Sequence, residues 1–214
     1  MKVLILVNGE LNNTDLLGKR VRGSSFDLVL GADGGAHHAS TLGVTLDALI
    51  GDMDSFSQSE QQNMGTVHLV SYPGEKNETD LELTLLYAGK QGAEHIVLVG
   101  MMGGRMDMTI ANILLIANVN LHSTRVEVWH GEQTGWIIKP PGGDVSGHPG
   151  DTVSLIPLGG RAYGITTRGL KYPLVNEELT FASVRGISNL LNRPSAHIKL
   201  SEGLLLAVHT PGRA

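Results

Sequence analysis

The chain has 214 residues, of which 41% are hydrophobic and 17% charged, as in an ordinary globular protein of one large domain or two small ones. Its formal net charge of −5 argues against a nucleic-acid backbone or an anionic membrane surface as the main partner. It contains no cysteine, which excludes disulfides, thiolate metal sites and a cysteine nucleophile.

The N-terminal residues 1–7 resemble the start of a signal peptide only superficially. The apolar run stops at Asn8-Gly9-Glu10 and is too short for a signal sequence or a membrane span. A first buried strand is the better interpretation, and no other stretch reaches spanning length. We therefore expect a cytoplasmic protein that has neither a membrane nor a nucleic acid as its partner.

Up to about residue 130, continuous apolar runs typical of buried strands alternate with helical patterns. Thr79-Asp80-Leu81-Glu82 has the capping-box spacing that opens a helix, and Gly92 lies just past its predicted end. A second helix is predicted from about Asp107. The alternation indicates an α/β fold with a mostly parallel sheet. The predicted strands occupy residues 2–7, 26–32, 46–50, 67–71, 95–99 and 125–129.

From about residue 132 the pattern changes to short runs separated by turns, such as Pro140-Pro141-Gly142-Gly143 and Leu158-Gly159-Gly160. No long helical period appears, which indicates antiparallel strands. We therefore expect an α/β N-terminal domain over residues 1–131 and an all-β, sandwich-like C-terminal domain over residues 132–214. The predicted strands of the second domain lie at residues 135–139, 152–157, 163–170, 179–182, 197–200 and 204–209.

An acidic turn, Gly51-Asp52-Met53-Asp54-Ser55, follows the third predicted strand. While the chain stays extended, the side chains of Asp52 and Asp54 lie on one face, where each disfavours ionisation of the other unless a cation lies between them. Mg²⁺ commonly uses one or two such carboxylates together with substrate phosphates. The alternative for this pentapeptide alone is a solvated turn with local hydrogen bonds.

Further aspartates follow the neighbouring strands. Asp33 comes after the second strand, Asp80 after the fourth and Asp107 after the fifth. Ligands of open α/β sheets bind outside the carboxyl ends of the strands, so these side chains and the acidic turn should share one edge. Five aspartates at one edge would repel one another strongly without cations. The pattern therefore favours a site for a divalent metal and a phosphate.

Glycines and cations accompany these acids. Gly103-Gly104, before the second helix, is either turn chemistry or a loop whose N–H groups approach a phosphate. Arg105 is either a surface arginine or a bidentate phosphate ligand, and Lys76 adds a positive charge in the neighbouring loop. Taken singly, Asp80 and Asp107 also suit the first turn or the N-cap of a helix. Neither a P-loop nor a dinucleotide fingerprint is present.

Four N-terminal motifs resemble, in order and spacing, those of thiamine pyrophosphokinases: Ala32-Asp33-Gly34-Gly35-Ala36, Gly51-Asp52-Met53-Asp54-Ser55, Thr79-Asp80-Leu81-Glu82 and Gly103-Gly104-Arg105-Met106-Asp107. Two C-terminal motifs are similar to that family as well: Gly169-Leu170-Lys171-Tyr172-Pro173-Leu174 and Arg185-Gly186-Ile187-Ser188-Asn189. The resemblance implies transfer of the terminal diphosphate of ATP to the hydroxyl of thiamine, giving thiamine diphosphate and AMP. It also implies Mg²⁺, a C-terminal β-sandwich, and a homodimer with active sites formed between subunits.

The resemblance also implies roles for single residues. Asp52, Asp54 and Asp80 match the magnesium-site acids, and with Arg105 they form the expected catalytic set. The sequence departs from the family at Asn77, where an acidic residue is common, and at Met108, where a histidine is common. The expected nucleotide-binding and thiamine-binding residues are Asp33, Gly34, Lys76, Asn77, Thr79, Gly104, Arg105, Asp107, Ser188 and Asn189.

The expected catalysis is mostly positioning and charge neutralisation, with Asp80 or Asp54 accepting the hydroxyl proton. An acidic cleft also suits the cationic thiazolium of thiamine. Two other classes of protein remain open at this stage: a sensor that binds thiamine diphosphate without turnover, and a metal-dependent phosphohydrolase that uses the same carboxylates on water. A different acceptor alcohol is a third alternative.

Overall fold

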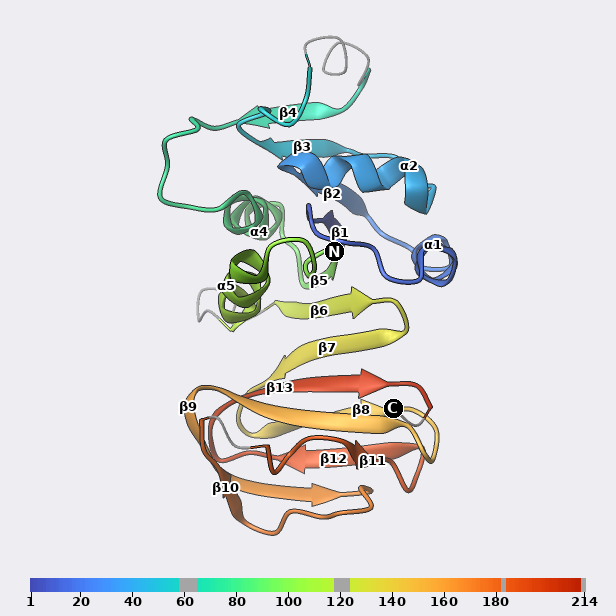
Figure 1. Cartoon of the computed structure of the whole chain (residues 1–214), viewed down its shortest axis with the longest axis vertical. Helices are drawn as coiled ribbons and strands as arrows, with labels where there is room; N and C mark the ends of the chain where they lie inside the picture. The colour runs from blue at the N-terminus through green and yellow to red at the C-terminus, as the bar shows by residue number, and fades with distance from the viewer. Residues whose placement is uncertain (58–64, 118–123, 182–183, 213–214) are drawn as a thin grey trace. The chain divides into compact units, whose positions relative to one another are not determined.

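The structure, a computed structural model, describes residues 1–57, 65–117, 124–181 and 184–212. The chain divides into two compact units, Met1–Gly131 and Glu132–Ala214 (Figure 1). Among the residues described, no helix is long and apolar enough to span a membrane.

The first unit is built on a parallel sheet, as predicted. The order β4-β3-β2-β1-β5-β6 places β1 at the centre, with Ile5 opposite both Leu30 and Leu98. Every neighbouring pair of strands in this order is parallel. The strands are β1 (Lys2–Leu6), β2 (Leu28–Ala32), β3 (Ala48–Gly51), β4 (His68–Ser71), β5 (His95–Val99) and β6 (Arg125–His130).

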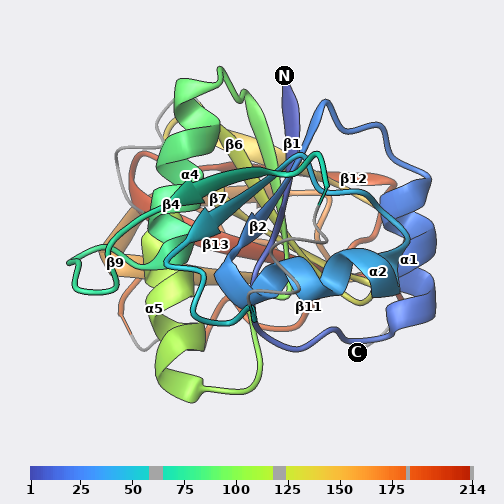
Figure 2. The ribbon, with the colours of Figure 1, turned by 90° about the horizontal axis from the view of Figure 1, so that it is seen from above.

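Helices cover both faces of this sheet: α4 and α5 lie on one side of it, and α1 and α2 on the other (Figure 2). Leu17 of α1 and Leu42 of α2 pack against Leu4 and Leu6 of the central strand. Burial of both faces explains why β1, β3 and β5 read as continuous apolar runs, whereas the edge strand β4 is mostly exposed. The helices are α1 (Thr14–Arg22), the short 3-10 helix η1 (Asp33–His37), α2 (His38–Leu42), α4 (Asp80–Lys90) and α5 (Met106–Ile116).

The two predicted helices are confirmed, and a side-chain cap explains where α4 begins. Thr79 is the N-cap of α4, and its Oγ1 accepts a hydrogen bond from the backbone N–H of Glu82 at 3.2 Å. The predicted apolar stripe of α4, Leu81, Leu85 and Ala88, is buried. Helix α5 begins one residue before the predicted start at Asp107.

The loops after β1 and β5 meet at the carboxyl edge of the sheet. The backbone N–H of Gly9 donates to the carbonyl of Gly100 at 2.7 Å, and that of Glu10 donates to Met102 at 2.7 Å. A Cβ at Gly9 would lie 2.5 Å from the carbonyl oxygen of Gly100, so only glycine permits this approach. Because β2 lies on one side of β1 and β5 on the other, this edge is the topological switch point where open α/β sheets bind ligands.

The second unit is an antiparallel β structure in the order β7-β13-β9-β12-β8, with β10 and β11 paired to β9. Its core includes Val153, Leu155, Ile165 and Leu205. The all-β prediction for this region is confirmed. The strands are β7 (Gln133–Ile138), β8 (Gly142–Ser146), β9 (Thr152–Arg168), β10 (Glu177–Leu179), β11 (Asn189–Leu190), β12 (Ser195–Lys199) and β13 (Glu202–Thr210).

The predicted turn at Leu158-Gly159-Gly160 is wrong. The two strands predicted at residues 152–157 and 163–170 form the single strand β9, which runs through both glycines. Gly159 and Gly160 adopt φ of 74° and 128°, and the pairing of β9 with β13 shifts register between Glu202 and Leu204. Glycine takes such φ values without steric cost, so the strand is irregular there and does not end.

Two further boundaries in the second unit differ from prediction. Residues Gly142 and Gly143, predicted as a turn, begin the unpredicted strand β8. The strand predicted at residues 179–182 is observed as β10, which ends at Leu179, and the position of Ala182 lies outside the described residues. The glycines and prolines of this region therefore led to more predicted turns than the structure has.

Candidate active site

A pocket of about 420 Å³ opens at the carboxyl edge of the first unit's sheet. The residues that follow β1, β2 and β5 line it, together with the first turns of α4 and α5. Five of the predicted site residues lie in its wall: Asp33, Thr79, Asp80, Gly104 and Arg105. Apolar side chains such as Leu81, Met101 and Met108 complete it, so the pocket combines an apolar wall with charged groups, as ligand sites do.

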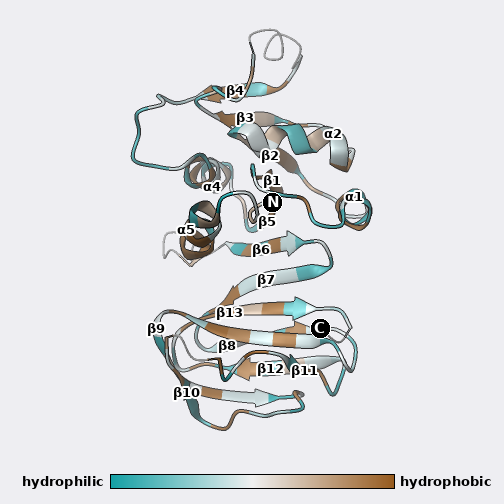
Figure 3. Cartoon of the chain, in the orientation of Figure 1, coloured by the Kyte–Doolittle hydropathy of each residue, from teal (hydrophilic) through white to brown (hydrophobic). Residues whose placement is uncertain are grey.

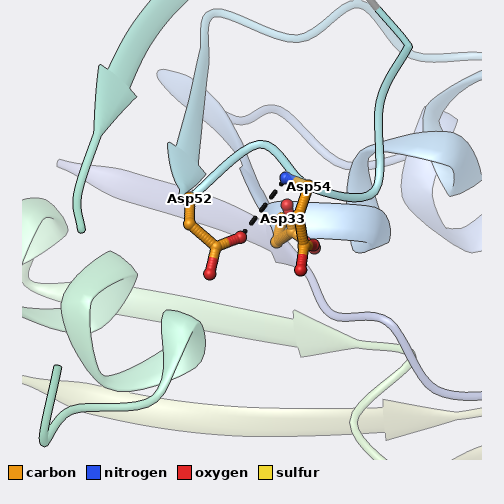
Figure 4. Close-up of side chains that lie close together, drawn as sticks. All are labelled: Asp33, Asp52 and Asp54. Carbon is orange, nitrogen blue, oxygen red and sulfur yellow. Dashed lines mark hydrogen bonds between the residues drawn. The ribbon is translucent and has the colours of Figure 1, made fainter. Parts of the chain in front are cut away.

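Three aspartates form a cluster, shown in Figure 4. One carboxylate oxygen each from Asp33, Asp52 and Asp54 lies within 4.8 Å of the others. The charge of Asp52, followed by that of Asp33, raises the pKa of Asp54. The backbone N–H of Asp54 and, more weakly, the charge of Lys76 lower the pKa of Asp52. Three carboxylates this close repel one another, and a divalent cation would relieve that repulsion.

Asp33 is the least exposed member of the cluster. Asp33 is only 8% exposed, and its buried Oδ1 has no hydrogen-bond partner among the described residues. Its φ of 42° is unusual for a residue other than glycine, and the hydroxyl of Ser55 donates to Oδ2. Glycine at position 51 lets the acidic turn approach Asp33, because a Cβ at this position would lie only 2.9 Å from the Cβ of Asp33.

Asp80 lies outside this cluster. The sequence predicted Asp80 as a metal ligand together with Asp52 and Asp54; in the structure it is Asp33 whose carboxylate lies within 4.8 Å of both. Lys76 Nζ donates to Asp80 Oδ1 at 2.7 Å and lies 3.5 Å from Asp52 Oδ2. Burial lowers the pKa of Lys76, but Asp80 and then Asp52 raise it overall, so the lysine is a charged link between these two acids.

Hydrogen bonds and an ion pair hold the predicted phosphate-binding loop, residues 103–107, in place. The N–H of Gly104 donates to Glu10 Oε1 at 3.0 Å, and both Gly103 and Gly104 have positive φ, 91° and 69°. Arg105 binds Asp107 through two hydrogen bonds, Nε to Oδ1 at 3.1 Å and Nη2 to Oδ2 at 2.5 Å. The Arg105 hydrogen bond is the main cause of the lowered pKa of Asp107.

Glu10 was not predicted as a site residue. The one available signal was its position directly after the first strand, at the edge that collects the loops.

Gly34 and Asn77, which were predicted, contribute differently. Gly34 makes room for Asn8, whose Nδ2 would lie 2.5 Å from a Cβ at that position, and Asn77 is exposed in the hydrophilic segment between β4 and α4 (Figure 3).

In the second unit, Ser188 and Asn189 have different roles. Asn189 is buried, its Oδ1 accepts from the N–H of Tyr172 at 3.0 Å, and its Nδ2 donates to the carbonyl of Tyr172 at 2.6 Å. Its amide therefore holds the two C-terminal motifs together. Ser188 is exposed with φ of 56°, and its backbone N–H donates to Ser154 Oγ at 3.1 Å. The Ser188 side chain is thus placed where a ligand can reach it.

Two family models match this chain. That of the thiamin pyrophosphokinase catalytic domain matches residues 23–129, half of the chain, and that of the thiamin pyrophosphokinase vitamin B1 binding domain matches residues 139–205. The chain belongs to the thiamin pyrophosphokinase family. This family consists of diphosphotransferases that use ATP. The resemblance seen in the motifs is confirmed, and it extends over both units.

Relatives match over nearly the full length. The thiamine pyrophosphokinase of Bacillus subtilis (strain 168) is 26% identical over 215 residues, which cover 98% of this chain and 99% of the relative. The crystal structure of the Geobacillus thermodenitrificans enzyme is 26% identical with a TM-score of 0.83, covering 100% of this chain and 99% of the other. Yeast thiamin pyrophosphokinase, at 18% identity, shares the fold with a TM-score of 0.79, covering 97% and 86%.

Proposed function

We propose that this chain transfers the terminal diphosphate of ATP to the hydroxyl of thiamine, forming thiamine diphosphate and AMP. The observation that carries the proposal is the juxtaposition, at one edge of the sheet, of a 420 Å³ pocket with the cluster of Asp33, Asp52 and Asp54. The family to which both units belong supports the same reaction.

The acidic mouth, meaning Asp33, Asp52, Asp54 and Asp80, fits Mg²⁺ by its chemistry. It offers carboxylate oxygens, the ligands that Mg²⁺ prefers. The buried Oδ1 of Asp33, which has no hydrogen-bond partner in the part of the chain that the structure describes, is the kind of atom that an ion satisfies. Asp52 and Asp54 are the proposed central ligands, with Asp33 and Asp80 on either side. When bound, Mg²⁺ supplies charge neutralisation for the phosphate oxygens.

Protein groups hold the phosphates and move the proton. Arg105, once released from Asp107, offers a bidentate donor at the pocket wall. The N–H groups of Gly103 and Gly104 donate to Thr109 Oγ1 and Glu10 Oε1, so they reach a phosphate only after leaving these partners. The thiamine hydroxyl oxygen attacks the β-phosphorus, the bond from that phosphorus to the α,β-bridging oxygen breaks, and AMP leaves. An aspartate of the acidic mouth, Asp80 or Asp54, accepts the hydroxyl proton.

A homodimer is part of this proposal. Helix α5 exposes an apolar stripe at intervals of four residues: Met106 is 78% exposed, Ile110 52% and Leu114 54%. Most of this helix is hydrophobic (Figure 3). The stripe begins one residue after Arg105, so a second copy docked on it would lie beside the pocket. Ser188 of the second unit is the proposed thiamine contact.

The dimer has its own test. The double variant Ile110→Glu/Leu114→Glu should shift the mass measured by light scattering from two chains to one and should lower activity. As a matched control, Tyr163→Glu changes an exposed large side chain of the second unit. A wild-type chain that is already monomeric at assay concentration would contradict the dimer and leave the reaction intact.

The reaction is tested by an end-point assay with ATP, Mg²⁺ and thiamine that resolves AMP, ADP and thiamine diphosphate. We expect equal amounts of AMP and thiamine diphosphate, abolished by Asp52→Asn and retained by Asp15→Asn in the exposed first turn of α1. Nucleotide cleavage independent of thiamine would indicate a hydrolase instead. Thiamine diphosphate binding without any product would indicate a sensor.

A further inference from the structure

Lys76 joins two carboxylates that come from different elements. Asp52 follows β3, and Asp80 begins α4; the Lys76 Nζ lies 3.5 Å from the first and 2.7 Å from the second. The lysine side chain is only 12% exposed, far less than a solvated surface lysine. The loop between β4 and α4 therefore places an ammonium group inside the acidic mouth.

Both carboxylates are ligands that the proposed function assigns to Mg²⁺. A carboxylate oxygen that accepts a hydrogen bond from an ammonium group is less available to a metal, and the ammonium charge repels a divalent cation. We propose that Lys76 is a resident counter-ion of the acidic mouth, which holds Asp52 and Asp80 together when no cation is bound and competes with the divalent cation for both. This proposal rests on the proposed function in taking these two acids as metal ligands.

The competition has a consequence for substrate binding. A divalent cation that binds alone must displace Lys76 from Asp80 and Asp52 with no new partner for the ammonium group. When ATP is present, its phosphate oxygens offer that partner, because Lys76 already lies beside a residue of the pocket wall, Asp80. Lys76 therefore disfavours the free metal more than it disfavours the metal–nucleotide pair, which couples the two binding events.

The experiment measures Mg²⁺ and Mn²⁺ binding to the full chain by calorimetry, without nucleotide, for wild type and Lys76→Met. A partly buried ion pair contributes more than an exposed one, so we expect about tenfold tighter metal binding in Lys76→Met. Lys76→Arg should stay close to wild type. The matched control is Lys90→Met in the last turn of α4, where the lysine is exposed and its removal should leave the affinity unchanged.

Two further measurements separate the role of Lys76 from general destabilisation. Metal-free Lys76→Met should have a lower Tm than wild type and should gain more from Mg²⁺, because the cation replaces the missing charge. With α,β-methylene-ATP, a nucleotide that cannot be cleaved between its α and β phosphorus atoms, the metal affinity should rise more in wild type than in Lys76→Met. Lys76→Gln serves as a second variant if Lys76→Met folds poorly.

The outcomes distinguish this inference from the proposed function. If Asp52→Asn weakens metal binding while Lys76→Met behaves like Lys90→Met, the metal site stands and the role of Lys76 is refuted. If Lys76→Met binds metal more weakly than wild type, Lys76 is not a competitor and the inference is equally refuted. If Asp52→Asn leaves metal binding unchanged, the proposed metal site itself fails.

Discussion

The hydroxyl of Ser55 donates a hydrogen bond to Oδ2 of Asp33, joining two residues 22 positions apart in the chain. Asp33 follows β2 and Ser55 lies in the turn after β3, so this bond fixes one acid of the cluster against the turn that carries the other two. The stacked rings of His37 and Phe56, with centroids 4.4 Å apart, hold the same two segments together. Ser55 is thus a positioning residue of the acidic mouth.

Ser55→Ala should weaken Mg²⁺ binding about fivefold to tenfold, since a hydrogen bond to a charged group contributes about 1.5–3 kcal/mol and part of this is recovered from water. The change should appear in the metal affinity measured by calorimetry and in the Mg²⁺ dependence of the rate, with a smaller change in kcat at saturating Mg²⁺. Ser40→Ala is the control, because the Ser40 hydroxyl donates to the backbone carbonyl of His37 and not to a carboxylate of the cluster. Equal metal affinity in both variants would contradict this role of Ser55.

Replacing each of two glycines by alanine should change the free energy of unfolding in opposite directions. A Cβ at Gly35 would lie 2.3 Å from the backbone carbonyl oxygen of Leu6, and backbone cannot move aside as a flexible side chain does. Gly35→Ala should therefore destabilise the chain by about 2–4 kcal/mol. Gly89, inside α4, has nothing within 4 Å of such a Cβ, so Gly89→Ala should stabilise by about 0.5–1 kcal/mol through helix propensity. Urea denaturation followed by circular dichroism measures both, and shifts of the same sign would disprove the argument.

Glu127 is a buried acid on β6 that should matter for stability. Its carboxylate accepts from Trp129 Nε1 at 3.0 Å and pairs with Arg125 at 2.7 Å. Burial raises the pKa of Glu127, but the Trp129 hydrogen bond and the charges of Arg125 and His95 together lower it. Glu127→Ala should destabilise by about 2–4 kcal/mol, because it leaves the buried Trp129 N–H unpaired and removes the partner of Arg125.

Urea denaturation of the Glu127 variants supplies the check. Glu127→Gln should lose less stability than Glu127→Ala, since the amide oxygen can still accept from Trp129. Glu178→Ala is the control, because Glu178 forms an exposed pair with Arg161 that should contribute little to stability. If Glu127→Ala resembled Glu178→Ala, the buried network would not be stabilising.

The low pKa of Asp151 indicates how the stability of the second unit should change with acid pH. Backbone hydrogen bonds from His148 and Gly212, together with His209, lower its pKa from 3.8 to about 2. The folded pKa lies below the unfolded value, so the stabilisation is complete above pH 3.8 and is lost as the pH falls from 3.8 toward 2. Asp151 is buried, and the difference between the two pKa values corresponds to about 2 kcal/mol.

Urea denaturation at pH 6 and pH 3 measures this contribution. Asp151→Asn should be less stable than wild type at pH 6, and the difference should shrink at pH 3 and disappear near pH 2. Asp144→Asn, at an exposed acid of β8, should show no such pH-dependent difference. A gap between wild type and Asp151→Asn that stays constant from pH 6 to pH 2 would show that the loss comes from packing rather than from the charge.

Local patterns were sufficient for the strands and for α4 and α5 of the first unit, and for the edge that carries the site, whereas α1 and α2 were not predicted. The apolar runs predicted its six strands. Five of them are largely buried, as strands covered on both faces are, whereas the edge strand β4 is mostly exposed. The spacing of Thr79 and Glu82 predicted the start of α4, since an N-cap bond spans only three residues. The placement of acids after parallel strands predicted one shared edge. The cytoplasmic location, which no observation tests, stays a prediction.

Only the tertiary structure decided which charges meet at that edge. Asp33 rather than Asp80 joins Asp52 and Asp54, because the left-handed φ of Asp33 and the Ser55 bond bring two loops together. The links from Lys76 to Asp52 and from Gly104 to Glu10 span 24 and 94 residues. The sequence alone was enough to predict the strands, the start of α4 and the order of the motifs, because the interactions that form these features act over a few residues. Contacts between distant loops depend on how the strands pair and on single backbone angles, which no local pattern encodes.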